Sequence, residues 1–201
     1  MIVKIYPDNP NPKAIERVVA VLESDGVIVY PTDTVYAFGC SLKSPKAIER
    51  LKAIRGKSTA DMAVVFADLS HIADYARVDN PTFKILKRNL PGPFTFILKA
   101  SGRVPDKLLE KRKTIGVRIP ENPIPLHLIE RLEAPLITAS VKDDDDVIEY
   151  TTDPELIDEK YGALVDLVLD GGFGNNEAST VVDCSGEELE ILRQGLGELQ
   201  M

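Results

Sequence analysis

Residues 27–36 read Val-Ile-Val-Tyr-Pro-Thr-Asp-Thr-Val-Tyr, an apolar run that stops at a proline and continues into two hydroxyls flanking a carboxylate. The first four residues are continuous and rich in β-branched side chains, which predicts a short strand buried on both faces. Because a packed strand fixes the side chains at its end, Thr32, Asp33 and Thr34 are suited to small-molecule recognition. A capped turn is the other interpretation, since threonine and aspartate commonly close loops after strands.

Strands and helices alternate along most of the remaining chain. Asn11-Pro12 and Ser44-Pro45 each place a capping side chain before a proline, which predicts helices that begin there, the first ending before Gly26. Further helices are predicted at 68–75, capped by Asp68, after Asn80-Pro81 with Phe83 on its buried face, at 123–132 and at 154–161. The predicted strands are 2–6, 27–30, 63–67, 94–98, 114–119, 136–141, 164–169, 179–183 and 189–192.

The last strands follow one another without helices between them, so the sheet is expected to be mixed parallel and antiparallel rather than wholly parallel. No internal repeat or linker-like segment is present. The sequence therefore predicts one α/β domain, residues 1–201, in which helices flank an open sheet.

The composition limits the classes of partner. Of the 201 residues 44% are hydrophobic, enough for a sizeable core, and 24 Lys and Arg against 32 Asp and Glu give a net charge of −8. Such a chain can bind nucleic acid only through a local basic patch. The absence of Trp argues against an aromatic platform for single strands. With no apolar run of about 18 residues and no basic leader, we expect a cytoplasmic protein without a membrane partner.

Familiar catalytic motifs are missing from the chain. His71 and His127 have no evident Ser or Cys partner, and the glycines fit neither phosphate-loop spacing. Cys40 and Cys184 are far apart and are interpreted as buried reduced thiols, without metal-ligand spacing. The acidic run at 143–146 is interpreted as a solvated loop, with a magnesium site as the alternative.

Polar side chains at the ends of predicted elements remain as candidates. Thr114 and Arg118 are four residues apart on one strand, so both point to the same face. An arginine buried there needs an anionic partner, which is either an internal carboxylate or a ligand. Thr138 and Ser140 alternate in the same way on another strand.

Two further segments also place cations at the ends of predicted elements. Arg55-Gly56-Lys57 lies between a helix and a strand, from where two cations could converge on phosphates. The alternative is a basic helix end that offsets the macrodipole. Arg193 closes the last predicted strand.

Four sequence blocks, in order, resemble the signature of the YrdC/YciO family, the L-threonylcarbamoyladenylate synthases and their relatives. They are PTDTVYAFG at 31–39, PGPFT at 91–95, TIGVRIP at 114–120 and ASTVVD at 178–183. The similarity spans nearly the whole chain. It implies a YrdC-like twisted α/β sheet with a concave, positively charged surface. It also implies a nucleotidyltransferase that converts L-threonine, bicarbonate and ATP to threonylcarbamoyl-AMP and pyrophosphate, for modification of an adenosine beside the tRNA anticodon.

The resemblance assigns the threonine contacts to Thr34, Arg118 and Thr138, with Arg118 as a bidentate clamp on the carboxylate. No protein nucleophile is required, because the threonine carbamate attacks the α-phosphorus directly. Positioning and charge neutralisation then carry the catalysis, and Mg²⁺ is expected to assist although no protein metal site is predicted.

The same resemblance implies the residues of the nucleotide site. They are Thr114, Ser140, Arg193 and, on the phosphates, Arg55 and Lys57. The two phosphate-binding cations and the carboxylate clamp would be the catalytic residues.

Several positions depart from the synthase pattern. Arg55-Gly56-Lys57 stands where the synthases carry Lys-x-Arg, and Ser140-Val141-Lys142 where they carry Ser-x-Asn. A family histidine falls on Phe66, and a nearby asparagine falls on Asp61. These changes make the chain more similar to the YciO branch of the family.

The alternative function is a YciO-type accessory protein that binds double-stranded RNA, tRNA or another structured RNA without synthase activity. Its support is a set of basic residues, for which solvated helix and loop faces are the favoured explanation. These residues are Lys84, Lys87, Arg88, Lys111, Arg112 and Lys113. Hydrolysis of a nucleotide-like compound in an altered pocket is a third option, supported only by the departures.

Overall fold

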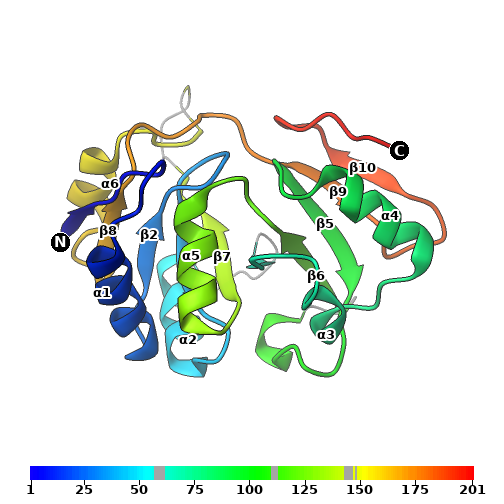
Figure 1. The fold of residues 1–201 in the computed structure, drawn as a ribbon, viewed down its shortest axis with the longest axis horizontal. Helices are drawn as coiled ribbons and strands as arrows, with labels where there is room; N and C mark the ends of the chain where they lie inside the picture. Colours follow the sequence, from blue (N-terminus) through cyan, green and yellow to red (C-terminus); the bar gives the residue numbers. More distant parts are fainter. Residues whose placement is uncertain (57–61, 110–112, 143–146, 148) are drawn as a thin grey trace.

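A single ten-stranded sheet runs through the computed structural model, which describes residues 1–56, 62–109, 113–142, 147 and 149–201 (Figure 1). Its strand order is β1-β8-β2-β3-β7-β4-β6-β5-β9-β10. The strands are β1 (Ile2–Lys4), β2 (Ile28–Tyr30), β3 (Ala37–Ser41), β4 (Ala63–Val65), β5 (Phe94–Lys99), β6 (Thr114–Arg118), β7 (Leu136–Ser140), β8 (Leu167–Asp170), β9 (Thr180–Asp183) and β10 (Glu190–Arg193).

Helices flank this sheet, as the sequence predicts. They are α1 (Pro12–Glu23), α2 (Pro45–Ile54), α3 (Ile72–Tyr75), α4 (Asn80–Asn89), α5 (Pro123–Leu132) and α6 (Pro154–Tyr161), together with the short 3₁₀ helix η1 (Asp106–Leu108). The predicted mixed α/β sheet is confirmed, because β4 pairs with β6 in parallel while β7 pairs with both β3 and β4 antiparallel.

Strand β3 was not predicted. Its residues, Ala37–Ser41, are all buried and pair with β2 on one side and β7 on the other. Ala-Phe-Gly-Cys-Ser contains no β-branched residue, so local propensity gives no strand signal there. Gly39 is required by packing, since a Cβ at this position would lie 2.6 Å from the ring of Tyr30.

Helix starts follow the predicted caps at two positions and differ at two others. Asn11 and Ser44 accept backbone N–H groups of α1 and α2 as expected. The cap of α4 is Asp79 rather than Asn80, because the Asp79 carboxylate accepts the Thr82 N–H at 2.9 Å. Asp68 does not cap α3. Its carboxylate instead closes a turn with the N–H of Ser70.

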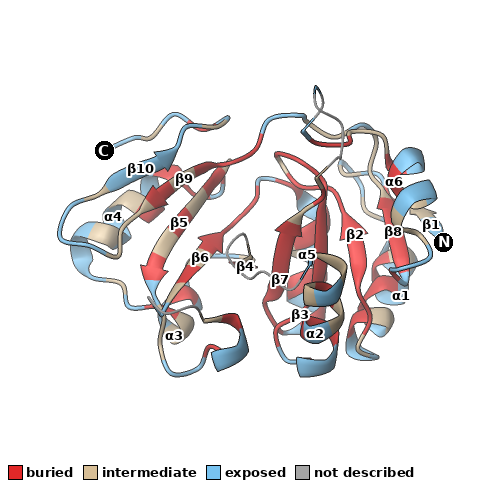
Figure 2. Ribbon diagram, turned by 180° about the vertical axis from the view of Figure 1, so that it is seen from behind, coloured by how far each residue is buried: buried red, intermediate tan, exposed pale blue. Residues whose placement is uncertain are grey.

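Two apolar cores lie on the two faces of the sheet. Ile28 and Tyr30 of β2 belong to the core that α1 and α5 cover, whereas Val29 belongs to the other core. This alternation confirms that β2 is buried on both faces (Figure 2). Phe83 was predicted on the buried face of α4, but it is 44% exposed. Leu86 on the same helix is buried in the core instead. No helix in the described ranges is long and apolar enough to cross a bilayer.

Candidate active site

The loop after β2 closes on itself through Thr32. Its hydroxyl donates to the Val35 carbonyl at 2.7 Å and accepts the Thr34 N–H at 3.0 Å. The Thr34 hydroxyl lies 3.1 Å from that of Thr32 and must donate to it, because the single Thr32 proton is already used. Thr32 therefore closes a turn, as one interpretation of this segment predicts, and Thr34 faces Arg118. A role of this segment in small-molecule recognition stays a prediction.

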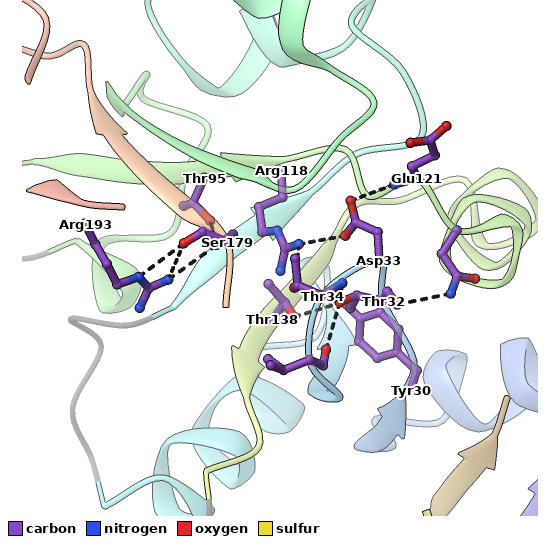
Figure 3. A network of polar contacts seen from close by, with 12 residues as sticks. Tyr30, Thr32, Asp33, Thr34, Thr95, Arg118, Glu121, Thr138, Ser179 and Arg193 are labelled. Carbon is purple, nitrogen blue, oxygen red and sulfur yellow. Dashed lines mark hydrogen bonds and ion pairs between the residues drawn. The ribbon is translucent and has the colours of Figure 1, made fainter. Parts of the chain in front are cut away.

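Arg118 ends β6 and is buried, with 5% of its surface exposed. Its Nη2 atom donates to Asp33 Oδ1 at 2.9 Å and to Thr34 Oγ1 at 3.1 Å (Figure 3). The internal carboxylate that the sequence left open as its partner is therefore Asp33. The Arg118 Nε, however, is buried without any hydrogen-bond partner. An unsatisfied buried donor costs about 1–3 kcal/mol, which makes this atom a candidate contact for an acceptor from a ligand.

Thr138 on β7 is fixed by two groups. The Tyr30 hydroxyl donates to Thr138 Oγ1 at 2.8 Å, and that oxygen donates to the Phe38 carbonyl at 3.3 Å. Burial raises the pKa of Tyr30 to about 12, so the phenol stays protonated at neutral pH and acts as the donor. The Thr138 proton is thus used, and this hydroxyl can offer a ligand only an acceptor lone pair.

The residues around Arg118 border a cavity of ≈ 330 Å³ over the middle of the sheet. Thr138 of β7 pairs with Ala63 of β4, and Ala63 pairs with Gly116 of β6. Two small residues, Ala63 and Gly116, therefore lie side by side next to Thr138. A Cβ at Gly116 would approach Thr95 Cγ2 to 2.9 Å and Ala63 Cβ to 3.1 Å. The cavity therefore has room over β4 and β6 because the side chains there are small or absent.

Five of the predicted site residues line this cavity: Thr114, Arg118, Thr138, Ser140 and Arg193. The prediction that Thr114 and Arg118 share a face is confirmed. Of the other three candidates, Thr34 is buried beneath Arg118 at 1% exposure, and Arg55 is the C-cap of α2 and is not among the described lining residues. Lys57 lies outside the described residues.

Two lining hydroxyls on the far side were missed by the sequence reasoning. Thr95 Oγ1 and Ser179 Oγ are 2.8 Å apart, and Arg193 donates to the Ser179 carbonyl through Nε at 3.1 Å and Nη2 at 2.8 Å. Both hydroxyls occur in blocks quoted for the resemblance. The alternation of Thr95 with buried Phe94 and Phe96 was the available signal.

The charge of the lining is opposite to that of the whole chain. Among the described lining residues Arg118, Lys142 and Arg193 are cations, and none is an Asp or Glu. A chain with net charge −8 thus concentrates positive charge where the site lies, which favours an anionic ligand.

The departures from the synthase pattern have different consequences. Lys142 lines the cavity, so the cation that replaces an amide does face the site. Phe66 is fully buried and packs against the ring of Tyr75 at 5.6 Å, so this position belongs to the core. Asp61, the acidic run at 143–146 and the Lys111 and Arg112 pair lie outside the described residues.

The histidines and cysteines lie outside the cavity lining. His71 and His127 are exposed and face carboxylates three residues onward, Asp74 and Glu130. Cys40 is a buried free thiol and Cys184 a partly buried one. Burial raises the pKa of Cys40 to about 12 and that of Cys184 to about 11.

Comparisons with known proteins establish the family and the fold. The family model Sua5_yciO_yrdC, described as telomere recombination, matches residues 20–195. The chain belongs to the Sua5/YciO/YrdC family. The uncharacterized protein YciO of Escherichia coli strain K12 is 40% identical over 199 residues, covering 98% of this chain and 96% of the relative. Its crystal structure superimposes with a TM-score of 0.93 at 38% identity, over 98% and 97% of the two chains.

More distant relatives have a named activity or a bound ligand. The threonylcarbamoyl-AMP synthase of Vibrio vulnificus strain YJ016 is 28% identical over 186 residues, covering 90% of this chain and 98% of that enzyme. The crystal structure of P. abyssi Sua5 complexed with L-threonine has a TM-score of 0.87 at 24% identity, covering 97% of this chain and 57% of the longer one. At that identity the likeness shows a shared fold.

Proposed function

We propose that this protein is an L-threonylcarbamoyladenylate synthase: L-threonine, bicarbonate and ATP give threonylcarbamoyl-AMP, pyrophosphate and water. The observation that carries the proposal is the buried Arg118, whose Nε has no hydrogen-bond partner. It lies beside a cavity whose described lining contains three cations and no Asp or Glu. Membership in a family that includes threonylcarbamoyl-AMP synthases supports the same activity.

The hydrogen-bond polarity around Arg118 suits an amino acid. Arg118 can only donate, which fits a carboxylate, whereas Thr138 has its proton committed and can only accept from a ligand. An amino acid presents a carboxylate acceptor together with ammonium and hydroxyl donors, and threonine has all three groups. A bidentate grip through Nε and Nη2 needs one existing Nη2 bond to yield, and the neutral Thr34 hydroxyl yields before the charged Asp33.

The rest of the cavity has the length and charge for a nucleotide. Thr114 and Arg118 are four residues apart on β6, about 13 Å along an extended strand. In this proposal Thr114, Ser140 and Arg193 contact the nucleotide. Arg55 and Lys57 would bind the phosphates, a role that the described cavity lining leaves as a prediction.

The reaction needs placement and charge neutralisation more than protein chemistry. Threonine and bicarbonate condense to the carbamate with loss of water. A carbamate oxygen then attacks the α-phosphorus in line, and the bond to the leaving pyrophosphate breaks. Arg118 holds the carboxylate of the nucleophile, while the other lining cations offset the negative charge that accumulates around phosphorus.

The described cavity lining offers no set of side chains that would coordinate Mg²⁺. No group of three or more His, Cys, Asp or Glu side chains suited to a metal ion occurs in the described ranges, and the described cavity lining contains no carboxylate. The described residues therefore do not fit a resident Mg²⁺, and no step of the mechanism depends on one. Magnesium can still enter as the complex with ATP, held by the phosphate oxygens.

The test is pyrophosphate release by the purified protein, with threonine, bicarbonate and ATP each omitted in turn. The proposal predicts release only when all three are present, together with a threonylcarbamoyl-AMP product detected by mass spectrometry. Release that is independent of threonine would indicate nucleotide hydrolysis instead. No release under any condition, with ATP and threonine failing to bind, would contradict the synthase.

The RNA-binding alternative would use the same concave surface without synthase chemistry, and its support is the set of basic residues. Lys84, Lys87 and Arg88 are exposed on α4, and none of them lines the cavity. If this face bound RNA, affinity would fall steeply with salt and would not require an amino acid. A filter-binding titration with tRNA at two salt concentrations separates that outcome from the synthase.

A further inference from the structure

Asp33 has no role in the assignments above, yet it makes the shortest contact to Arg118. We propose that Asp33 is a positioning residue for the substrate carboxylate: it holds Arg118 from behind and fixes the guanidinium beside the cavity. This inference rests on the proposed function, because it concerns how the same site grips the amino acid.

Asp33 is anchored at both of its oxygens. Oδ1 accepts from Arg118 Nη2 at 2.9 Å, and Oδ2 accepts the backbone N–H of Glu121 at 3.1 Å. The side chains of Asp33 and Arg118 are only 8% and 6% exposed. A carboxylate held at two points in a buried place cannot rotate away easily, so it fixes the arginine that it binds.

The order of the groups makes Asp33 a support rather than a ligand contact. Arg118 lines the cavity, whereas Asp33 does not. Figure 3 shows Asp33 on the opposite side of Arg118 from Arg193, which lies across the cavity. The sequence in space is therefore Asp33, the guanidinium, and then the place for the substrate carboxylate.

Two opposite effects of Asp33 can be separated. If the carboxylate only offset the charge of Arg118, its removal would make the cavity more positive and tighten the binding of an anion. If it positions Arg118, its removal lets the guanidinium turn and weakens the binding. The double anchoring favours the second effect.

The experiment compares L-threonine, L-threoninol and AMP as ligands of the full chain by calorimetric titration. Threoninol carries a hydroxymethyl group in place of the carboxylate, so it lacks the charged, two-oxygen acceptor that Arg118 would grip. We expect Asp33→Asn to weaken threonine binding about 10-fold, and to change threoninol and AMP binding less than about 2-fold. Asparagine keeps the size and one acceptor, which limits damage to the loop.

Asp166→Asn is the matched control. Asp166 also accepts one backbone N–H, from Val27 at 2.8 Å, and one guanidinium, from Arg50 at 2.8 Å, but it lies outside the cavity lining. This variant should leave the affinity for all three ligands unchanged. If Asp33→Asn does not fold, as judged by circular dichroism, Asp33→Glu keeps the charge but shifts it, and the same selective loss is expected.

Equal weakening of threonine and threoninol would mean that Asp33 acts only on the fold of the site. Unchanged or tighter threonine binding would also overturn the proposal. A wild-type protein that binds no threonine at all would instead refute the proposed function, and the positioning role with it. Wild-type affinity thus distinguishes the two failures.

Discussion

The two walls of the cavity are built differently. The Arg118 wall is formed by Arg118 and Thr138, both buried and held by hydrogen bonds to Asp33, to Thr34 beneath Arg118 and to Tyr30. The Arg193 wall consists of Thr95, Ser179 and Arg193. Its arginine is exposed on β10, an edge strand whose four residues are all exposed, and is held mainly by one backbone carbonyl.

This difference separates two tasks. A buried arginine with fixed partners is already arranged for one small ligand, so little conformational entropy is lost on binding. An arginine on an exposed edge strand keeps more freedom and can adjust to a larger, flexible ligand. The Arg118 wall accordingly suits the amino acid, and the Arg193 wall suits the nucleotide. The following predictions test that division.

The largest effect is expected from Arg118→Lys. Lysine keeps a charge near Asp33 but lacks the Nε donor and the planar fork, so threonine affinity should fall about 100-fold while AMP affinity changes little. Calorimetric titration with each ligand provides the measurement. Arg50→Lys, which alters another arginine–aspartate pair outside the cavity lining, is the control and should change neither affinity.

Arg193→Ala should affect the other wall. Loss of this cation is expected to weaken AMP and ATP binding about 10-fold while threonine affinity stays within about 2-fold. Stability should hardly change, because β10 is an exposed edge. Arg88→Ala removes an exposed cation of α4 outside the cavity lining and serves as the control. A loss of threonine affinity in Arg193→Ala would show that the two walls are not independent.

Tyr30→Phe removes the donor behind Thr138. The expected cost is about 1 kcal/mol in the free energy of unfolding, since one buried hydrogen bond is lost and Thr138 keeps its bond to Phe38. Urea denaturation measures this change. Tyr36→Phe also loses a buried phenol, one bonded to Gly171 and Gly172. Only Tyr30→Phe should alter threonine affinity, and equal effects of both variants would contradict the assignment of Thr138.

The smallest effect expected near neutral pH is on stability, from buried groups whose pKa values are raised. Burial raises the pKa of Tyr30 and Tyr36 from 10.0 to about 12 and that of Cys40 from 9.0 to about 12. Raised folded-state pKa values mean that the stability is complete below pH 9 and is lost as pH rises toward 12, because the unfolded chain ionises first. Urea midpoints measured from pH 7 to pH 11 should be constant at first and then fall.

Sequence alone predicted those parts of the molecule that depend on local signals. Asn11 and Ser44 fix helix starts by short-range capping, and Thr114 and Arg118 share a face because strands alternate. Strand β3 was missed because Ala37–Ser41 has little strand propensity and is held by pairing with its two neighbours in the sheet, β2 just upstream and β7 far downstream in the chain.

The candidate site shows the same limit. Chemistry predicted that a buried Arg118 needs a negative partner, but only the fold shows that Asp33, 85 residues away, takes Nη2 and leaves Nε unpartnered. Ser179 was missed for a similar reason, because its importance comes from the Arg193 side chain of a neighbouring strand. The placement of Arg55 beside phosphates stays a prediction.

A structure determined with bound L-threonine tests the central claim most directly. The account predicts an oxygen of the threonine carboxylate within hydrogen-bond distance of Arg118 Nε, with Asp33 still bonded to Nη2. An amino acid found elsewhere in the molecule, with Nε still unpartnered, would contradict it.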